Sequence, residues 1–178
     1  MLESSQTQPT QDIHERLVEL LSREGASYRV IEHVPEGRTE IIAAIRGNRL
    51  EQAIKSMVVQ VRHGKKDNRY YLANVPGDRR VDFEAIRSAF EADSAAFAPR
   101  ARAEALAGCV IGSIPPFSFN DNLVVLADPD IRQNEEVVFN AGRLDRSIFM
   151  KMEDYVRIAR PRFLKIALRG SGRDEPSP

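Results

Sequence analysis

The 178-residue sequence has a single cysteine, no tryptophan and no net charge. One cysteine, Cys109, excludes an internal disulfide and favours a reducing, cytoplasmic setting. The 26 acidic and 26 basic residues balance, so no overall field attracts nucleic acid or a membrane, and any nucleic-acid contact needs a local patch. No apolar run approaches the ~20 residues of a membrane span, and the polar first residues lack the apolar stretch of a secretory signal. We therefore expect a cytoplasmic protein.

Metal and cofactor signatures are also missing. The three histidines, His14, His33 and His63, lie far apart, and none pairs with Cys109 at a spacing suited to metal ligands. The sequence contains no P-loop, no dinucleotide-binding fingerprint and no Gly-x-Ser-x-Gly elbow. We expect neither a metal nor a cofactor.

The hydrophobic content of 42% is enough for one domain with a sizeable core. We expect this domain over residues 12–168, between disordered tails at 1–11 and 169–178. Apolar spacing and capping residues predict about five helices and seven strands, which indicates an α/β or α+β fold. The predicted helices cover residues 12–25, 38–47, 81–92, 99–108 and 153–159. The predicted strands cover residues 27–34, 57–63, 69–76, 122–128, 135–142, 147–152 and 163–168.

The segment GCVIGSIPPFSFN, residues 108–120, mixes signals that seldom occur together. Cys109–Ile111 reads as a short strand that stops at Gly112, and two prolines stiffen the chain just beyond. One interpretation is a rigid turn that closes a core. The other is a preshaped loop that presents its backbone amides to a ligand. Because proline has no N–H, the donors would be the amides of Gly112, Ser113 and Ile114.

Three further residues have both a chemical and a structural interpretation. Lys55 stands between apolar stretches at a strand entrance, where a desolvated ammonium is costly unless a polar or anionic group meets it; alternatively, its head reaches water. Cys109 is either a core residue or a nucleophile, if the fold supplies a histidine. His33 ends a strand and is either functional or a hydrogen-bonded structural residue. His14 and His63 are expected to face solvent.

Five segments occur in an order typical of one family: LLSREGASYRVIEHV, AIRGNRL, GCVIGSIPPFSFN, FNAGRLDRS and DYVRIARP. With Lys55, they make the sequence resemble the YbaK family of freestanding aminoacyl-tRNA editing domains, which is related to the insertion domain of bacterial prolyl-tRNA synthetase. The resemblance covers nearly all of residues 12–168. It is greatest to the YeaK branch, which is associated with removing serine or threonine from wrongly charged tRNA.

The resemblance implies a mixed α+β fold with a β-sheet of about seven strands, curled toward a barrel and flanked by helices. It also implies a trans-editing deacylase, which hydrolyses the ester of mischarged tRNA, above all seryl- or threonyl-tRNA. An attacking water assisted by the substrate's own ribose hydroxyl would need placed donors but no covalent nucleophile. The expected partner is the acceptor end of tRNA, with an aminoacyl-tRNA synthetase as a further candidate.

By position, the family lysine falls on Lys55, and the loop glycine and proline fall on Gly112 and Pro116. The implied catalytic residues are Lys55, Gly112, Ser113 and Ile114. The implied substrate-binding residues are His33, Thr39, Pro115, Pro116, Asn140, Ala141 and Gly142. Other branches have serine or histidine versions of the Asn-Ala-Gly motif. We expect a slot for a small acyl group, in which Asn140 meets a substrate hydroxyl directly.

Three basic segments are candidates for phosphate contact, although charged residues also simply solvate a surface. They are Arg46 with Arg49, residues 62–66, and Arg100 with Arg102. Two other functions stay open. One is a non-catalytic module of the same fold that binds tRNA or a synthetase. The other is a small-molecule esterase or amidase that uses Cys109.

Overall fold

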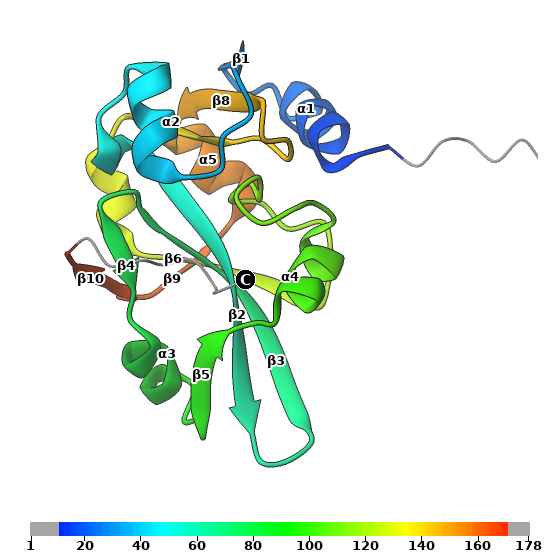
Figure 1. Cartoon of the computed structure of the whole chain (residues 1–178), viewed down its shortest axis with the longest axis vertical. Coiled ribbons are helices and arrows are strands. Elements are labelled where there is room, and N and C mark those ends of the chain that lie inside the picture. Colours follow the sequence, from blue (N-terminus) through cyan, green and yellow to red (C-terminus); the bar gives the residue numbers. More distant parts are fainter. Residues whose placement is uncertain (1–10, 171–178) are drawn as a thin grey trace, which may run out of the picture.

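The computed structural model describes residues 11–170, so the predicted tails lie almost entirely outside the described residues. Within this range the chain forms five α-helices, two 3-10 turns and ten strands (Figure 1). The helices are α1 (Ile13–Arg23), α2 (Thr39–Arg46), α3 (Phe83–Ala89), α4 (Arg100–Ala107) and α5 (Met152–Ala159), and the turns are η1 (Leu50–Gln52) and η2 (Pro129–Gln133). The strands are β1 (Tyr28–Glu32), β2 (Ile54–His63), β3 (Asp67–Pro76), β4 (Arg79–Val81), β5 (Ser94–Phe97), β6 (Leu123–Ala127), β7 (Glu136–Asn140), β8 (Arg146–Lys151), β9 (Arg162–Phe163) and β10 (Ala167–Arg169).

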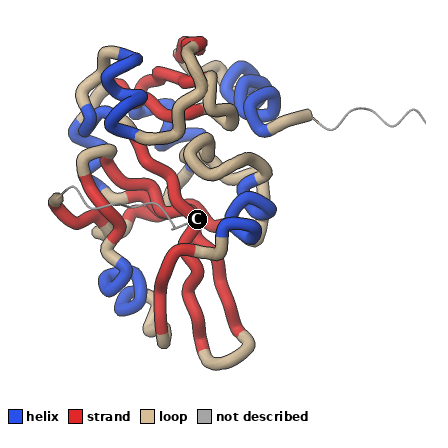
Figure 2. Tube along the Cα trace, in the orientation of Figure 1, coloured by secondary structure: helices blue, strands red, loops and turns tan. Residues whose placement is uncertain are grey.

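The strands of the described residues belong to three sheets. The largest has the order β5-β2-β3-β6-β9, and its long β2–β3 hairpin projects from the body of the molecule (Figures 1 and 2). A second, antiparallel sheet has the order β1-β8-β7, and β4 pairs with β10 in the third. A single parallel bridge between Ala53 and Val138 joins the first two sheets.

The α+β class is confirmed, but the expectation of one curled, barrel-like sheet is wrong. None of the three sheets closes on itself, and in the described part of the chain β1 pairs only with β8. Apolar alternation shows that a segment is a strand, but partner choice depends on residues more than a hundred positions away. The very short strands β4 and β5 were not predicted, and the expected strand at 163–168 is divided between β9 and β10.

The predicted strand Cys109–Ile111 is also wrong, because this segment forms a turn. Gly108 and Gly112 enclose it, and both have left-handed backbone angles, with φ of 75° and 90°. Val110 supplies the carbonyl that accepts the Ser113 N–H at 3.1 Å. The two left-handed glycines turn the chain on either side of this segment, and it does not continue as an extended strand.

Helix α1 begins where it was predicted to, and it packs against the end of β7. Asp12 caps it in a reciprocal arrangement with Glu15, in which each carboxylate accepts the other residue's N–H. The first turn of the helix brings His14 Nδ1 to 2.8 Å from the Ala141 carbonyl. His14 is therefore partly buried and not solvent-facing as expected, and the same is true of His63.

The segment that follows Gly112 enters two different parts of the core. Ile114 is buried with residues of β2, β3 and α4. Phe117 belongs to the larger cluster, where its ring lies 5.8 Å from that of Phe139 and 5.4 Å from that of Tyr155. The loop is thus anchored at both ends by apolar side chains.

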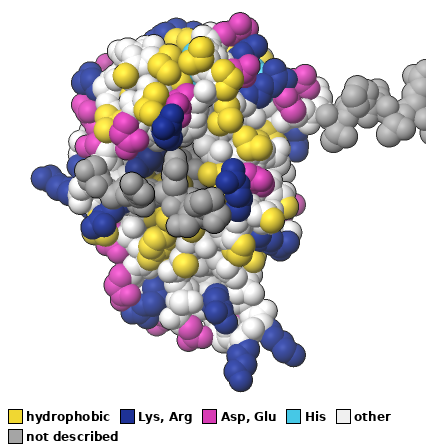
Figure 3. Space-filling model, in the orientation of Figure 1, with side chains coloured by type: hydrophobic (Ala, Val, Ile, Leu, Met, Phe, Trp, Pro, Cys, Tyr) yellow, Lys and Arg dark blue, Asp and Glu magenta, His cyan; other side chains and the backbone are white. Residues whose placement is uncertain are grey.

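Basic side chains gather over the β2–β3 hairpin, at the lower end of the molecule in Figure 3. Arg62, Lys65, Lys66 and Arg69 are all exposed there. Among residues 11–170, no helix has both the length and the apolar character needed to span a membrane.

Candidate active site

One edge of strand β2 contacts β7 at its start and β5 further along, and between these two contacts the edge is open. Ala53 bridges to β7 just before the strand, and Val59–Arg62 pair with β5 further along. The Ala98 N–H donates to the Val58 carbonyl at 2.9 Å, so Val58 directs its main-chain groups toward β5. The backbone N–H and C=O groups of alternate residues in a strand point in the same direction. The backbone groups of Ser56 therefore face the same edge as those of Val58. No described strand pairs with this edge of β2 at that point, whereas β3 pairs with the other edge.

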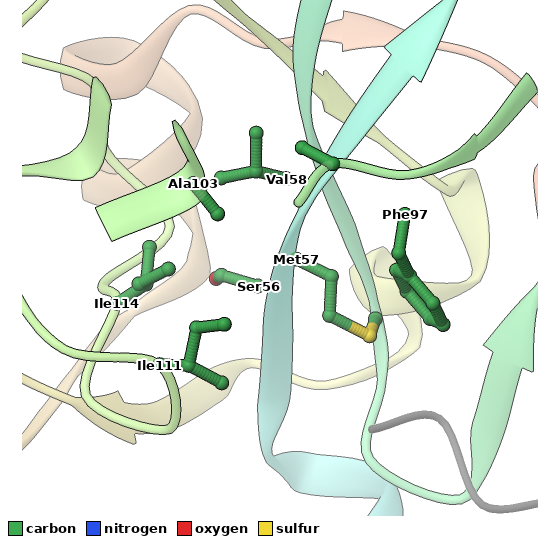
Figure 4. Close-up of a pocket in the computed structure, with 8 residues that line it drawn as sticks. Ser56, Met57, Val58, Phe97, Ala103, Ile111 and Ile114 are labelled. Carbon is green, nitrogen blue, oxygen red and sulfur yellow. The ribbon is translucent and has the colours of Figure 1, made fainter. Parts of the chain in front are cut away.

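A pocket opens at this edge and holds about 280 Å³ of empty space, part of it open to solvent (Figure 4). Three consecutive residues of β2 line it, Ser56, Met57 and Val58. Successive side chains of a strand leave opposite faces, so the pocket must lie along the edge of β2 and not on one face alone. The other lining residues are all apolar: Phe97, Ala98, Ala103, Ile111 and Ile114.

Lys55 is the residue of β2 immediately before this pocket. It is partly buried and lies opposite Val75 of β3 in the hairpin register. Its side chain leaves the strand on the face opposite that of Ser56.

The loop from Gly112 to Ile114 has one amide in use and two without a partner. The Ser113 N–H and the Ser113 hydroxyl both donate to the Val110 carbonyl, at 3.1 and 2.7 Å. The Ser113 carbonyl accepts the Gly142 N–H at 2.8 Å. Within residues 11–170, neither Gly112 nor Ile114 has a hydrogen-bond partner for its N–H. The N–H groups of Gly112 and Ile114 can therefore still donate a hydrogen bond to a ligand.

Pro115 and Pro116 are buried and do not line the pocket. A side chain of β3, Asn74, donates through Nδ2 to the Pro116 carbonyl at 3.4 Å and to the Tyr155 hydroxyl at 3.0 Å. Together with the buried Phe117 ring, this contact fixes the far end of the loop. The interpretation of residues 108–120 as a rigid turn that closes a core is therefore confirmed, and the presentation of its amides to a ligand stays a prediction.

Asn140 ends β7 and uses its hydrogen-bonding groups inside the protein. Its Nδ2 donates to the carbonyls of Gly112 and Glu36, at 2.6 and 3.2 Å. Its Oδ1 accepts from Arg46 at 3.2 Å and from Ser147 at 3.3 Å. Arginine can only donate, which fixes the orientation of the amide. The direct contact expected between Asn140 and a substrate hydroxyl would thus have to displace one of these partners.

His33 belongs to the same hydrogen-bonded cluster. Its Nδ1 lies 2.8 Å from the Val34 carbonyl, which can only accept, so Nδ1 carries a proton. Its Nε2 lies 2.7 Å from Ser147 Oγ, and Ser147 is fully buried. Both ring nitrogens are therefore engaged within the protein.

Arg46 was expected in a surface patch with Arg49, but the structure places it within this cluster. It donates to Asn140 and to Ser147, the latter at 3.1 Å, and to Asn48 at 3.0 Å. The salt bridges of the described chain do not include Arg46, and burial lowers its pKa to about 10. Arg49 instead forms an exposed ion pair with Glu51 at 2.8 Å.

The remaining predicted residues divide between the cluster and the surrounding scaffold. Ala141 is buried, and its carbonyl faces His14. Gly142 has a φ of 82° and lies directly against the start of α1. Thr39 is the first residue of α2 and packs near Gly77, outside the cluster. The structure therefore joins a group of predicted residues and leaves Thr39 apart. Ile114 lines the pocket, and Lys55 precedes it along β2 without lining it. The joined residues are His33, Gly112, Ser113, Asn140, Ala141 and Gly142.

Cys109 has the features of a core residue. Its thiol lies 3.8 Å from the Ala107 carbonyl, and burial raises its pKa to about 11. The thiolate is the nucleophilic form, so the raised pKa makes this thiol a weaker nucleophile near neutral pH than an ordinary cysteine. No histidine hydrogen-bonds to it among the described residues. These observations disfavour the alternative of a cysteine esterase.

Three polar residues at the site were not singled out from the sequence: Ser56, Asn74 and Ser147. Each lies within a strand, but only Asn74 has apolar residues on both sides, Ala73 and Val75. Polar residues are usually outside the core, so a polar residue between apolar ones was an available signal for Asn74 alone.

The comparisons with known proteins agree with this arrangement. The model of the aminoacyl-tRNA editing domain family matches residues 34–158. The chain belongs to this family, and the resemblance noted in the sequence is confirmed.

Particular relatives narrow the comparison. The chain is 42% identical over 149 residues to the multifunctional Ser/Thr-tRNA deacylase ProXp-y of Escherichia coli strain K12, a match that covers 83% of this chain and 89% of that protein. The protein of the same name from Escherichia coli O157:H7 matches equally well. Two crystal structures share the fold. The hypothetical protein APE2540 has a TM-score of 0.78 at 18% identity and covers 86% of this chain and 100% of its own. A protein provisionally assigned as a trans-editing enzyme for prolyl-tRNA synthetase has a TM-score of 0.72 at 20% identity, with 90% and 99% covered.

Proposed function

We propose that this protein is a trans-editing deacylase that hydrolyses the ester bond of mischarged tRNA, with seryl- and threonyl-tRNA as substrates. The observation that carries the proposal is the 42% identity, over 83% of the chain, to a Ser/Thr-tRNA deacylase. A physical argument also supports the proposal, because a small and mostly apolar pocket lies next to the Gly112–Ile114 loop and follows Lys55 along β2.

Hydrolysis joins the oxygen of water to the ester carbonyl carbon and breaks the bond from that carbon to the ribose oxygen. The products are the free amino acid and a tRNA whose ribose oxygen has received a proton. Negative charge develops on the carbonyl oxygen in the transition state, where fixed donors are most effective. The unpartnered amides of Gly112 and Ile114 are our candidates for these donors, and the Ser113 amide is not, because Val110 already accepts it.

Lys55 supplies a positive charge beside the pocket for the terminal ribose or phosphate of the tRNA. The vicinal ribose hydroxyl orients the attacking water, which needs no covalent nucleophile from the protein. Asn140 and His33 act as positioning residues. The Asn140 side chain donates to the Gly112 carbonyl at 2.6 Å. Arg46 holds Asn140 in place directly, and His33 does so through Ser147.

The β2–β3 hairpin supplies a second contact with tRNA. Lys65 and Lys66 are exposed and, among the described residues, form no ion pair. Arg100 and Arg102 are less suitable, because Arg100 pairs with Glu104 and Arg102 covers the Tyr70 ring. Seven residues of extended strand separate Ser56 from His63, or about 24 Å at ~3.4 Å per residue. Phosphates of the acceptor stem at that distance from the ester would meet the hairpin tip.

The experiment that tests the function is deacylation of a panel of aminoacyl-tRNAs by the pure protein. We expect kcat/KM to be highest for seryl- and threonyl-tRNA, lower for alanyl- and prolyl-tRNA, and negligible for phenylalanyl-tRNA. Failure to release any amino acid, with tRNA still bound, would instead identify a non-catalytic module of the same fold.

A further inference from the structure

The hydroxyl of Ser56 is a polar group without a partner beside the pocket. In the described chain, the buried side-chain atoms that lack a hydrogen-bond partner are Ser56 Oγ, Asn74 Oδ1 and His63 Nε2. Of these three residues only Ser56 lines the pocket. Figure 4 shows its oxygen on the side of the strand where Ala103, Ile111 and Ile114 lie. An unsatisfied buried hydroxyl is unfavourable for the free protein, so a ligand that pairs with it gains free energy.

The other polar groups of the site are already engaged. Asn140 uses both its donors and its acceptor, and both ring nitrogens of His33 have partners. Ser113 gives its hydroxyl proton to Val110. Among the described residues near the pocket, Ser56 alone keeps a side-chain donor and acceptor for a ligand.

Asn74, which faces Ser56 across the β2–β3 hairpin, leaves the Ser56 hydroxyl available to bind a ligand. Ser56 lies opposite Asn74 in the β2–β3 register, and directly opposed residues have Cβ atoms about 4.5–5.5 Å apart on the same face. Asn74 Oδ1 is an acceptor without a partner among the described residues. Because both atoms lack a partner, they do not hydrogen-bond to each other, and the Ser56 hydroxyl keeps its proton and its lone pairs for a ligand.

We propose that Ser56 is the specificity-determining residue, which hydrogen-bonds the side-chain hydroxyl of a seryl or threonyl ester. The inference rests on the proposed deacylase function and assigns to Ser56 the recognition first expected of Asn140. The apolar walls of Val58, Ile111 and Ile114 exclude competing water, which strengthens a hydrogen bond at this position. An alanyl group would leave Ser56 unpaired, and a site built to bind a hydroxyl rejects such analogues strongly.

The test is to measure kcat/KM on seryl-, threonyl- and alanyl-tRNA for the full-length wild type and for Ser56→Ala. We expect the variant to lose seryl-tRNA activity by about ten- to a hundredfold and to change alanyl-tRNA activity less than about threefold. Its melting temperature should stay the same or rise, because the substitution removes an unsatisfied buried hydroxyl. A purely structural serine would instead lower the melting temperature and reduce all three activities together.

Two further variants sharpen the measurement. Ser56→Thr retains the hydroxyl but adds a methyl group to the pocket, so the preference for seryl over alanyl should persist while threonyl-tRNA suffers most. Ser94→Ala removes a serine from β5 outside the pocket and should leave every ratio unchanged. A wild-type preference for seryl-tRNA that survives Ser56→Ala would overturn this inference and leave the deacylase function standing. Inactivity of the wild type on all three substrates would instead refute the function.

Discussion

Gly112 and Gly37 are in direct backbone contact, so that a side chain on Gly112 would clash and one on Gly37 would be tightly packed. A Cβ on Gly112 would lie 2.9 Å from the Gly37 Cα, and a Cβ on Gly37 would lie 3.2 Å from the Gly112 Cα. Gly112 also has a φ of 90°, which L-residues rarely adopt. We expect Gly112→Ala to displace the loop, lower stability by about 2 kcal/mol or more, and abolish most deacylation.

The matched control for this variant is Gly25→Ala. Gly25 has a similar left-handed φ of 67°, but no atom lies within 4 Å of a Cβ there. It should lose only about 1 kcal/mol of stability and keep its activity. Equal effects of the two substitutions, measured by chemical denaturation and deacylation, would show that the contact with Gly37 is unimportant.

Lys55→Ala should reduce kcat/KM for seryl-tRNA by about a hundredfold or more, because it removes a positive charge beside the reacting ester. Circular dichroism should show a folded protein. Lys151→Ala, which removes an exposed lysine from the end of β8, serves as the control and should be fully active. Normal turnover by a folded Lys55→Ala protein would remove this residue from the proposed site.

Cys109→Ala should retain activity and lose about 1 kcal/mol of stability from the shortened core contact. With a pKa raised by burial to about 11, the thiol should react with iodoacetamide far more slowly than a free cysteine at pH 8. Mass spectrometry of the folded protein measures this rate. Inactivation by rapid alkylation, or by Cys109→Ala in a folded protein, would favour a thiol mechanism over attack by water.

Asn140→Ala should lower both stability and kcat, because it leaves the Gly112 and Glu36 carbonyls and a donor of Arg46 without their partner. The expected loss of stability is about 1–3 kcal/mol. Because Asn140 is proposed to position the loop and not to bind the acyl group, the ratio of seryl to alanyl activity should remain. Asn134→Ala removes an exposed amide that also donates to a carbonyl and should have little effect. A selective loss of seryl-tRNA activity in Asn140→Ala would restore the direct contact with substrate.

Replacing Lys65 and Lys66 by alanine should raise KM for every aminoacyl-tRNA by a similar factor and leave kcat unchanged. Each lost phosphate contact reduces the dependence of binding on salt, so the slope of log K against log salt should fall by about 1–2 units for the pair. Binding measured at several salt concentrations checks this. An unchanged slope would show that the hairpin tip does not meet the tRNA.

Local sequence determined the helices and the positions at which they end. Asp12 caps α1, and Gly47 ends α2 with a φ of 73°, each through interactions within a few residues of the chain. The alternation of apolar residues indicated the longer strands for the same reason. Lys55 and the stiff loop after Gly112 could be singled out because a lysine between apolar stretches and adjacent prolines are conspicuous without any knowledge of the fold.

Tertiary structure alone decided which strands became neighbours and which polar groups found partners. The division into three sheets, and with it the open edge at Ser56, depends on pairings such as β1 with β8 across more than a hundred residues. Arg46 changed from a surface candidate to a buried support of Asn140 because the fold brings α2 against β7 and β8. Among the serines of residues 11–170, Ser56 is distinguished by a hydroxyl that is buried and has no partner, and hydrogen-bond satisfaction of a buried group is a property of its surroundings in space.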